Sequence, residues 1–268
     1  MPQNDCLVCK GTDFIELLHL EQFPIFFGAV HSEKISKVEC FPLTIAICDQ
    51  CSLVQQINLL EEKILNEVYT AEYYNCPSPL MTGMGISEIE KFYSFFQNCQ
   101  LTPGKLLEIA CFDGYLLEKL KNEGWDVYGC DPSSATQMAI ERLGKEKIVN
   151  DFFTSDTYPS ESFDVIIFRN LLEHLYEPND FMQAVSRCLK PGGQIFVDVP
   201  NVKALIDLGS FGTFFHQHAS YFSLYTLSTL IEEFQFKVEN VYEGSPNLFV
   251  EAVKLSDGLT SIKSLNHS

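Results

Sequence analysis

The sequence predicts an α/β protein built on a doubly wound, mostly parallel β-sheet. From residue 105 onward, short apolar runs alternate with longer segments of helical periodicity, which is typical of βαβ units. The last two apolar runs are separated only by a short turn containing Gly244 and Pro246, which predicts an antiparallel hairpin at the sheet edge. The predicted strands cover residues 106–110, 127–130, 148–149, 165–168, 195–199, 238–242 and 248–253, and the predicted helices cover 114–122, 134–143, 181–189 and 224–234.

The segment before this sheet is expected to contain two further helices. Residues 86–99 place apolar side chains at helical spacing, the pattern of an amphipathic helix packed on a sheet. Residues 59–69 also look helical, and the aromatic and proline-containing stretch 73–79 interrupts them. We therefore expect an N-terminal domain (1–58), a linker with N-terminal helices (59–100), the sheet domain (101–255) and a disordered polar tail (256–268).

Composition and charge exclude two classes of partner. No apolar run approaches the roughly 18 residues that a membrane-spanning helix needs, so no membrane partner is expected. The 36 acidic side chains outnumber the 18 basic ones, and a net charge of −18 would repel a phosphate backbone, which argues against nucleic acid. The first residues lack a basic segment followed by an apolar one, so we expect a soluble, cytoplasmic protein. A small-molecule substrate remains, and nothing here indicates the oligomeric state.

Four of the ten cysteines form two C-x-x-C pairs, Cys6 with Cys9 and Cys48 with Cys51, separated by strand-like sequence. In a zinc ribbon each such turn supplies two thiolates to a tetrahedral metal. Because four protein thiolates leave no open position, the predicted Zn²⁺ is structural. The alternative is that the turns are redox-active or incidental. The scattered cysteines are interpreted as reduced core residues: Cys40, Cys76, Cys99, Cys111, Cys130 and Cys188.

Carboxylates follow three successive predicted strands. The first strand ends in the run 107–114, which contains Glu108 and lies immediately before a helix, and the N-terminus of that helix suits the carboxylate of an amino-acid moiety. Asp131 ends the second strand, where a carboxylate can accept hydrogen bonds from ribose hydroxyls. Asp151 and Phe152 end the third, offering an acid for an exocyclic amine and an aromatic face for a purine. Their order predicts an adenosine-containing ligand, and the segment differs from the G-x-G-x-x-G pattern of nicotinamide enzymes.

Several motifs carry a family resemblance. Residues 106–117 (LLEIACFDGYLL) resemble motif I of class I S-adenosylmethionine-dependent methyltransferases, although Ala110 and Phe112 stand where glycines are usual. The segments 163–166 (FDVI), 172–174 (LEH) and 189–193 (LKPGG) match later motifs. The resemblance implies a Rossmann-like seven-stranded sheet of order 3-2-1-4-5-7-6 and S-adenosylmethionine as cofactor. The implied cofactor-binding residues are Glu108, Ala110, Cys111, Asp113, Gly114, Tyr115, Asp131, Pro132, Asp151, Phe152, Phe153, Arg169 and Asn170.

With the four cysteines and Tyr74, the segment 215–223 (FHQHASYFS) makes residues 6–254 similar to zinc-containing C-methyltransferases of deoxysugar nucleotides, a family with a further C-terminal domain that these residues lack. The resemblance implies that His174 acts as a base, with Tyr74 and His218 positioning the acceptor or stabilising an enolate. The family's Tyr-His-Glu-His element reads Phe-His-Gln-His here, so Phe215 and Gln217 replace its tyrosine and glutamate. Gln217 forms hydrogen bonds but cannot act as a base.

Three functions are therefore compared. The first is C-methylation of a nucleotide-linked sugar or natural-product intermediate through an enolate. The second is O- or N-methylation of a small molecule, which needs no enolate. The third is a catalytically inactive, methyltransferase-like binding or partner subunit.

Overall fold

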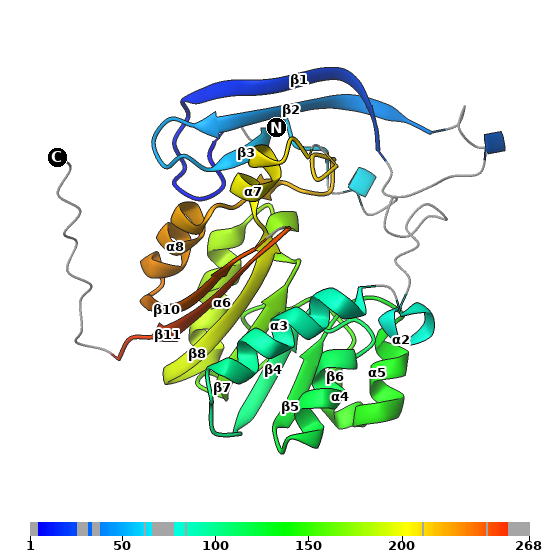
Figure 1. Cartoon of the computed structure of the whole chain (residues 1–268), viewed down its shortest axis with the longest axis vertical. Coiled ribbons are helices and arrows are strands. Elements are labelled where there is room, and N and C mark those ends of the chain that lie inside the picture. The colour runs from blue at the N-terminus through cyan, green and yellow to red at the C-terminus, as the bar shows by residue number, and fades with distance from the viewer. Residues whose placement is uncertain are drawn as a thin grey trace.

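The computed structural model describes residues 5–25, 32–33, 38–61, 63–65, 78–83, 85–210, 212–244 and 246–256. These residues form a seven-stranded sheet with helices on both faces and a four-stranded sheet that lies across one of its ends (Figure 1). Among them, no helix is both long and apolar enough to cross a bilayer.

The large sheet has the strand order β10-β11-β8-β7-β4-β5-β6. Neighbouring strands from β6 to β8 run parallel, whereas β11 is antiparallel to both β8 and β10. This confirms the predicted order 3-2-1-4-5-7-6 and the C-terminal hairpin. The strands are β4 (Lys105–Ile109), β5 (Asp126–Cys130), β6 (Ile148–Val149), β7 (Phe163–Arg169), β8 (Leu189–Pro200), β10 (Phe236–Glu243) and β11 (Asn247–Lys254).

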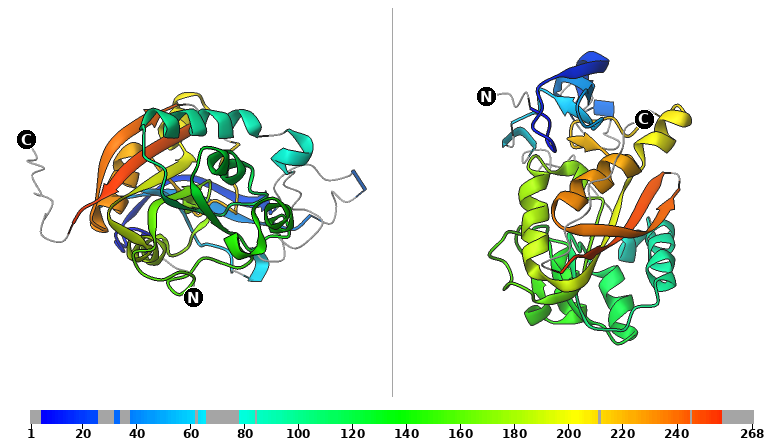
Figure 2. Two further views of the ribbon diagram at one scale, coloured as in Figure 1. Left: turned by 90° about the horizontal axis from the view of Figure 1, so that it is seen from below. Right: turned by 90° about the vertical axis from the view of Figure 1, so that its left-hand side faces the viewer.

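Helices cover both faces of this sheet (Figure 2) because each carries an apolar stripe at helical spacing. On one face, α3, α4 and α5 bury residues such as Phe92, Leu117 and Ala139. On the other face, α6 and α8 bury Met182 and Leu227. The bounds are α3 (Ile86–Asn98), α4 (Tyr115–Asn122), α5 (Thr136–Leu143), α6 (Pro178–Cys188) and α8 (Leu224–Glu233).

The N-terminal sheet consists of β1 (Phe14–Pro24), β2 (Cys40–Cys48), β3 (Val54–Ile57) and β9 (Ser220–Tyr221), in that order. All of its pairings are antiparallel, and β9 is supplied by the segment that follows β8 and a short helix. The N-terminal residues Leu7 and Leu53 also share one buried cluster with Leu172 and Phe222 of the larger domain. The two parts of the chain are therefore joined by backbone pairing as well as by a common core.

Short elements complete the described chain: α2 (Pro79–Thr82), η2 (Lys145–Lys147), η3 (Leu172–His174) and α7 (Val202–Asp207). Of the helix predicted at 59–69, residues 63–65 are helical, and 66–69 lie outside the described residues. The stretch 73–77, with Tyr74 and Cys76, also lies outside them, as does the predicted tail beyond Ser256.

The space around Gly129 in β5 is too small for a side chain. A Cβ atom there would lie 2.6 Å from the Cys111 sulfur and 2.8 Å from a Leu117 methyl. We predict that Gly129→Ala lowers the free energy of unfolding by about 1–3 kcal/mol, because both neighbours are buried. Urea denaturation measures this. Gly212→Ala is the matched control, since no atom lies within 4 Å of the added Cβ; equal stability of the two variants would contradict the packing argument.

Candidate functional site

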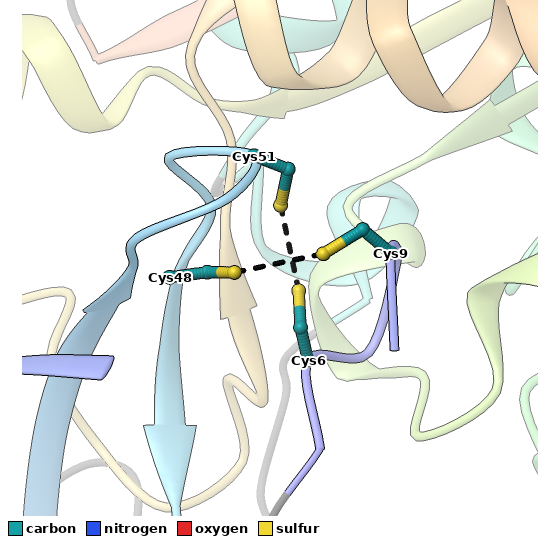
Figure 3. Close-up of side chains that lie close together, drawn as sticks. All are labelled: Cys6, Cys9, Cys48 and Cys51. Atoms are coloured by element: carbon teal, nitrogen blue, oxygen red, sulfur yellow. Dashed lines mark hydrogen bonds between the residues drawn. The ribbon is translucent and has the colours of Figure 1, made fainter. Parts of the chain in front are cut away.

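The two C-x-x-C turns meet in space, as Figure 3 shows. The sulfur atoms of Cys6 and Cys51 are 3.5 Å apart, as are those of Cys9 and Cys48. Four thiolates around a tetrahedral Zn²⁺ with bonds of about 2.3 Å would be separated by about 3.8 Å, so the donor set fits this ion. The structure brings together all four predicted ligands.

The cysteine cluster is held by contacts from several elements. Gln55, buried in β3, accepts a hydrogen bond from the Leu7 backbone N–H at 2.9 Å, which fixes the first turn. The Asn179 amide in α6 donates to the Val8 carbonyl at 2.9 Å. The hydrogen bond with the Cys51 thiol holds the pKa of Cys6 below its usual value, which favours the thiolate form of this cysteine. The turns are thus anchored to the N-terminal sheet and to α6 of the larger domain.

The loop after β4 has an unusual backbone. Ala110 and Phe112 have φ angles of 61° and 50°, and Gly114, which precedes α4, has 76°. The first two residues therefore adopt the left-handed conformation that glycine favours, although neither is a glycine. Asp131, at the end of β5, supports this loop because its carboxylate accepts the Phe112 N–H at 3.0 Å and the Ser133 N–H at 2.8 Å.

Asp113 is engaged by other parts of the protein. Its carboxylate accepts hydrogen bonds from the Ser78 hydroxyl at 2.6 Å, the Leu80 N–H at 3.2 Å and the Tyr115 N–H at 3.1 Å. Ser78 is also the N-cap of α2. Asp113 therefore fastens α2 to the loop after β4.

Two other predicted cofactor ligands direct their side chains away from the loop. Cys111 is buried, with its sulfur packed toward Gly129. Tyr115 donates its hydroxyl to Glu90 of α3 at 2.8 Å. Only the backbone of these residues belongs to the edge formed by the carboxyl ends of the strands.

Glu108 and Arg169 form a buried pair where β4 and β7 end. The Arg169 Nε lies 3.4 Å from one Glu108 oxygen, and the guanidinium also lies 5.4 Å from the centre of the Phe92 ring. The other oxygen, Oε2, is buried without a hydrogen-bond partner among the described residues. Burial raises the pKa of Glu108 to about 7, and Arg169 partly offsets this rise.

The third-strand residues lie further along the same edge. The Phe152 ring is 66% exposed beside the exposed Asp151, so an aromatic face is available to a ligand. Phe153 instead packs against Phe181 of α6 with ring centres 5.8 Å apart. Pro132 and Asn170 are exposed in the loops after β5 and β7.

The histidines lie beyond the ends of β7 and β8. His174, in η3, donates from Nδ1 to the Gln217 carbonyl at 2.8 Å, and its ring centre is 4.7 Å from that of His218. Burial lowers the pKa of His174 to about 4, so its ring is neutral at pH 7. The structure therefore brings together His174, Gln217 and His218, while Tyr74 lies outside the described residues.

The segment 215–218 is fixed by β3 and by Ile25, the residue that follows β1. The Gln56 amide donates to the carbonyl of Phe215 at 3.0 Å and to that of His216 at 3.1 Å, and it also contacts the His218 carbonyl. The Gln217 side chain donates to the Ile25 carbonyl at 3.3 Å. Gln217 therefore contacts His174 through its backbone carbonyl and Ile25, next to the N-terminal sheet, through its side chain.

Sequence reasoning missed three residues of this site. Glu173 was part of a motif without a role, yet it is 1% exposed beside both histidines. Asp198 in β8 is buried, accepts a hydrogen bond from Asn247 at 2.6 Å, and has a pKa raised to about 6 by burial. A single acid inside the apolar run 195–199 was a usable signal for Asp198. Gln56 gave no comparable signal.

The carboxyl edge of the sheet is rich in buried acidic side chains. The buried acids near it are Glu108, Asp113, Asp131, Glu173 and Asp198. Such a concentration of carboxylates suits a ligand with cationic groups, and S-adenosylmethionine carries a sulfonium and an ammonium. The orphaned Glu108 oxygen and the open loop at Ala110 and Phe112 fit this cofactor.

Comparison with known proteins agrees with this arrangement. The sheet order and the edge define the class I S-adenosylmethionine-dependent methyltransferase domain. A family model described as "Methyltransferase domain" matches residues 85–241, and the chain belongs to this family.

Curated relatives include a C-methyltransferase, NovU of Streptomyces niveus, which is 27% identical over 248 residues, covering 90% of this chain and 58% of the relative. A ubiquinone biosynthesis O-methyltransferase of Pectobacterium atrosepticum is 31% identical over 107 residues, covering 37% of this chain and 44% of the relative. The chain thus spans about half the length of these curated relatives.

Among solved structures, the 1,6-didemethyltoxoflavin-N1-methyltransferase of Burkholderia thailandensis, with bound 1,6-didemethyltoxoflavin and S-adenosylhomocysteine, has a TM-score of 0.58 at 15% identity. The similarity covers 80% of this chain and 96% of that protein. The PH0226 protein of Pyrococcus horikoshii has a TM-score of 0.53 at 18% identity, covering 66% of this chain and 96% of that protein. At these identities the likeness is one of fold.

The pKa of the Glu108 carboxyl group predicts how the affinity for the cofactor depends on pH. With a pKa of about 7, its carboxyl is neutral below pH 7 and ionised above it. If the ionised form binds the cofactor ammonium, affinity for S-adenosylhomocysteine should rise about tenfold between pH 6 and pH 8. Calorimetric titration across this range measures the effect. Glu108→Gln should bind more weakly at pH 8 with a flatter profile, and a flat profile for the native protein would refute the assignment.

Proposed function

We propose that this protein transfers the methyl group of S-adenosylmethionine to a small-molecule acceptor. The main support for this proposal is the carboxyl edge of the sheet. There, buried carboxylates and a loop whose backbone has positive φ angles at Ala110 and Phe112 match a cationic nucleoside cofactor. In this proposal Glu108 and the backbone of residues 110–115 bind the amino-acid part of the cofactor. Asp113 fastens the loop after β4, and Arg169 and Asn170 flank this loop. Asp131 and Pro132 border the ribose, and Asp151, Phe152 and Phe153 border the adenine.

The acceptor is proposed to lie on the other side of the transferred methyl, beside His174 and His218. When bound, the cofactor supplies an electrophilic methyl group, and the chain must align the acceptor and exclude water. For C-methylation, His174 takes the acceptor proton, while His218, Gln217 and Tyr74 position the acceptor or stabilise its enolate. The relation to a C-methyltransferase over 90% of this chain supports this choice.

Methylation at oxygen or nitrogen is the second candidate. Phe215 and Gln217 lack the hydroxyl and carboxylate that the sugar C-methyltransferases place there, so support for enolate chemistry is reduced. A curated relative is an O-methyltransferase, and its similarity covers 37% of this chain. An oxygen acceptor needs no carbanion.

The N-terminal part, residues 1–58, is proposed to bind one structural Zn²⁺ through Cys6, Cys9, Cys48 and Cys51. Its strand β3 pairs with β9 and contacts the segment 215–218, which carries His218. Support comes from the converging sulfurs and from the hydrogen bonds of Gln55 and Gln56, which connect the cysteine turn to the histidine segment.

Elemental analysis of the purified chain tests the metal. We predict about one zinc per chain, lost in Cys51→Ser together with several kcal/mol of stability, because structural zinc contributes on the order of 10 kcal/mol to small domains. Cys40→Ser is the control, since Cys40 is exposed and outside the cluster. A folded native protein without metal would contradict this assignment.

His174→Ala tests the catalytic proposal. Transfer of labelled methyl groups from S-adenosylmethionine to a panel of nucleotide-linked sugars and hydroxylated aromatics should fall by about 10²–10⁴-fold. Affinity for S-adenosylhomocysteine should change little, because the cofactor edge is intact. His19→Ala in β1 is the control, since His19 pairs with Thr44 away from the site.

Two outcomes would decide against this proposal. Unchanged turnover in His174→Ala would remove that residue from the reaction. Failure of the native protein to bind S-adenosylhomocysteine would instead favour an inactive, methyltransferase-like partner subunit.

A further inference from the structure

A carboxylate and two imidazoles converge beside the proposed methyl-transfer site. One oxygen of Glu173 and one ring nitrogen each of His174 and His218 lie within 4.8 Å of one another. Glu173 is 1% exposed and His218 is 7% exposed. These groups are separate from the four cysteines and are not explained by cofactor binding.

Glu173 is the most unusual member of the group. Both of its carboxylate oxygens are buried without a hydrogen-bond partner among the described residues. A buried carboxylate without partners is costly, so natural proteins normally supply a hydrogen-bond donor, a counter-charge or a metal ion. Burial and the negative charge of the nearby Asp198 raise the pKa of Glu173 to about 8, and a bound cation would offset both effects.

The histidines have the hydrogen bonds that metal ligands commonly use. His174 donates Nδ1–H to the Gln217 carbonyl at 2.8 Å, and this bond fixes the tautomer and the orientation of the ring. The His218 ring is hydrogen-bonded to the Thr213 backbone, and its Nδ1 is buried without a partner among the described residues. Both rings are therefore held in place by backbone groups.

The backbone also fixes the two segments relative to each other. The Ala219 N–H donates to the Glu173 carbonyl at 2.7 Å, next to the bond between His174 and the Gln217 carbonyl. These two bonds join η3 to the segment before β9. The group is thus preorganised, and its ligand atoms need to approach by at most about 2 Å to reach bonds of about 2.1 Å to a common ion.

We propose that Glu173, His174 and His218 bind one divalent cation, whose open positions accept two neighbouring oxygen atoms of the methyl acceptor. This inference rests on the proposed methyl transfer in its second form, methylation at oxygen, and it makes His174 a metal ligand instead of a base. Two imidazoles and one carboxylate suit Zn²⁺, Mn²⁺ or Fe²⁺, and leave positions free for substrate. The site is distinct from the thiolate cluster, which has no open position.

The acceptor class follows from this geometry. A cation lowers the pKa of a hydroxyl bound to it. Because the ion has more than one open position, it can bind both oxygen atoms of a vicinal diol or an α-hydroxy ketone, which favours these acceptors over an isolated alcohol. The hydroxyl proton passes to water, and the oxygen forms a bond to the methyl carbon as the carbon–sulfur bond breaks. Sulfur keeps the electron pair of that bond, which gives the methyl ether, S-adenosylhomocysteine and one proton.

Manganese provides the test, because Mn²⁺ prefers nitrogen and oxygen ligands to thiolates. The zinc content of the full chain is measured first, and Mn²⁺ is then titrated while the electron paramagnetic resonance signal of free Mn²⁺ is recorded. We expect one bound Mn²⁺ per chain. Glu173→Gln and His218→Gln should each weaken binding at least tenfold and abolish the Mn²⁺-dependent rise in Tm.

Glu232→Gln is the matched control, since Glu232 is an exposed glutamate on α8, and it should bind Mn²⁺ like the native protein. Glu173→Gln preserves the side-chain shape, so thermal unfolding without metal verifies that it folds. No Mn²⁺ binding by the native protein, or equal binding by Glu173→Gln, would overturn the inference. Binding of S-adenosylhomocysteine is measured separately in metal-free buffer, so failure of the methyltransferase proposal is distinguished from failure of the cation site.

Discussion

The hydrogen bonds of two adjacent glutamines in β3 connect the main parts of this structure. Gln55 holds the turn that carries Cys6 and Cys9, and Gln56 holds three carbonyls of the segment that carries Gln217 and His218. Both side chains are almost fully buried, so their bonds are protected from competition by water. The position of the histidines therefore depends on a strand that belongs to the cysteine-bearing sheet.

The sheet itself was predictable because its sequence signals are local. Alternating apolar runs and helical segments identified every strand from β4 to β11 except β9, and the short turn before β11 identified the hairpin. Motif spacing likewise placed Glu108, Asp131 and His174 at one edge, since the carboxyl ends of parallel strands meet there. The four cysteines were found because paired C-x-x-C turns constrain each other.

The remaining features depend on contacts between distant residues. The two-residue strand β9 has no periodicity to detect, and its pairing with β3 is set by Gln56 and the surrounding core. The inward orientation of Cys111 depends on space left by Gly129, which no local pattern reveals. Glu173 resembled an ordinary motif residue until the fold enclosed it beside His218. Buried polar groups of this kind can be assigned only when their surroundings are known.

The late position of β9 in the chain has a consequence for folding. Gln56 and His218 are separated by 162 residues, so the N-terminal sheet cannot acquire its fourth strand until most of the chain has been synthesised. Closing so long a loop costs conformational entropy, although this cost grows only slowly with length. A contact of this range also slows folding. If the four cysteines bind a metal early, the metal would restrict the conformations of the N-terminal segment before β9 is available. The first three strands would then stay close together while the rest of the chain is synthesised.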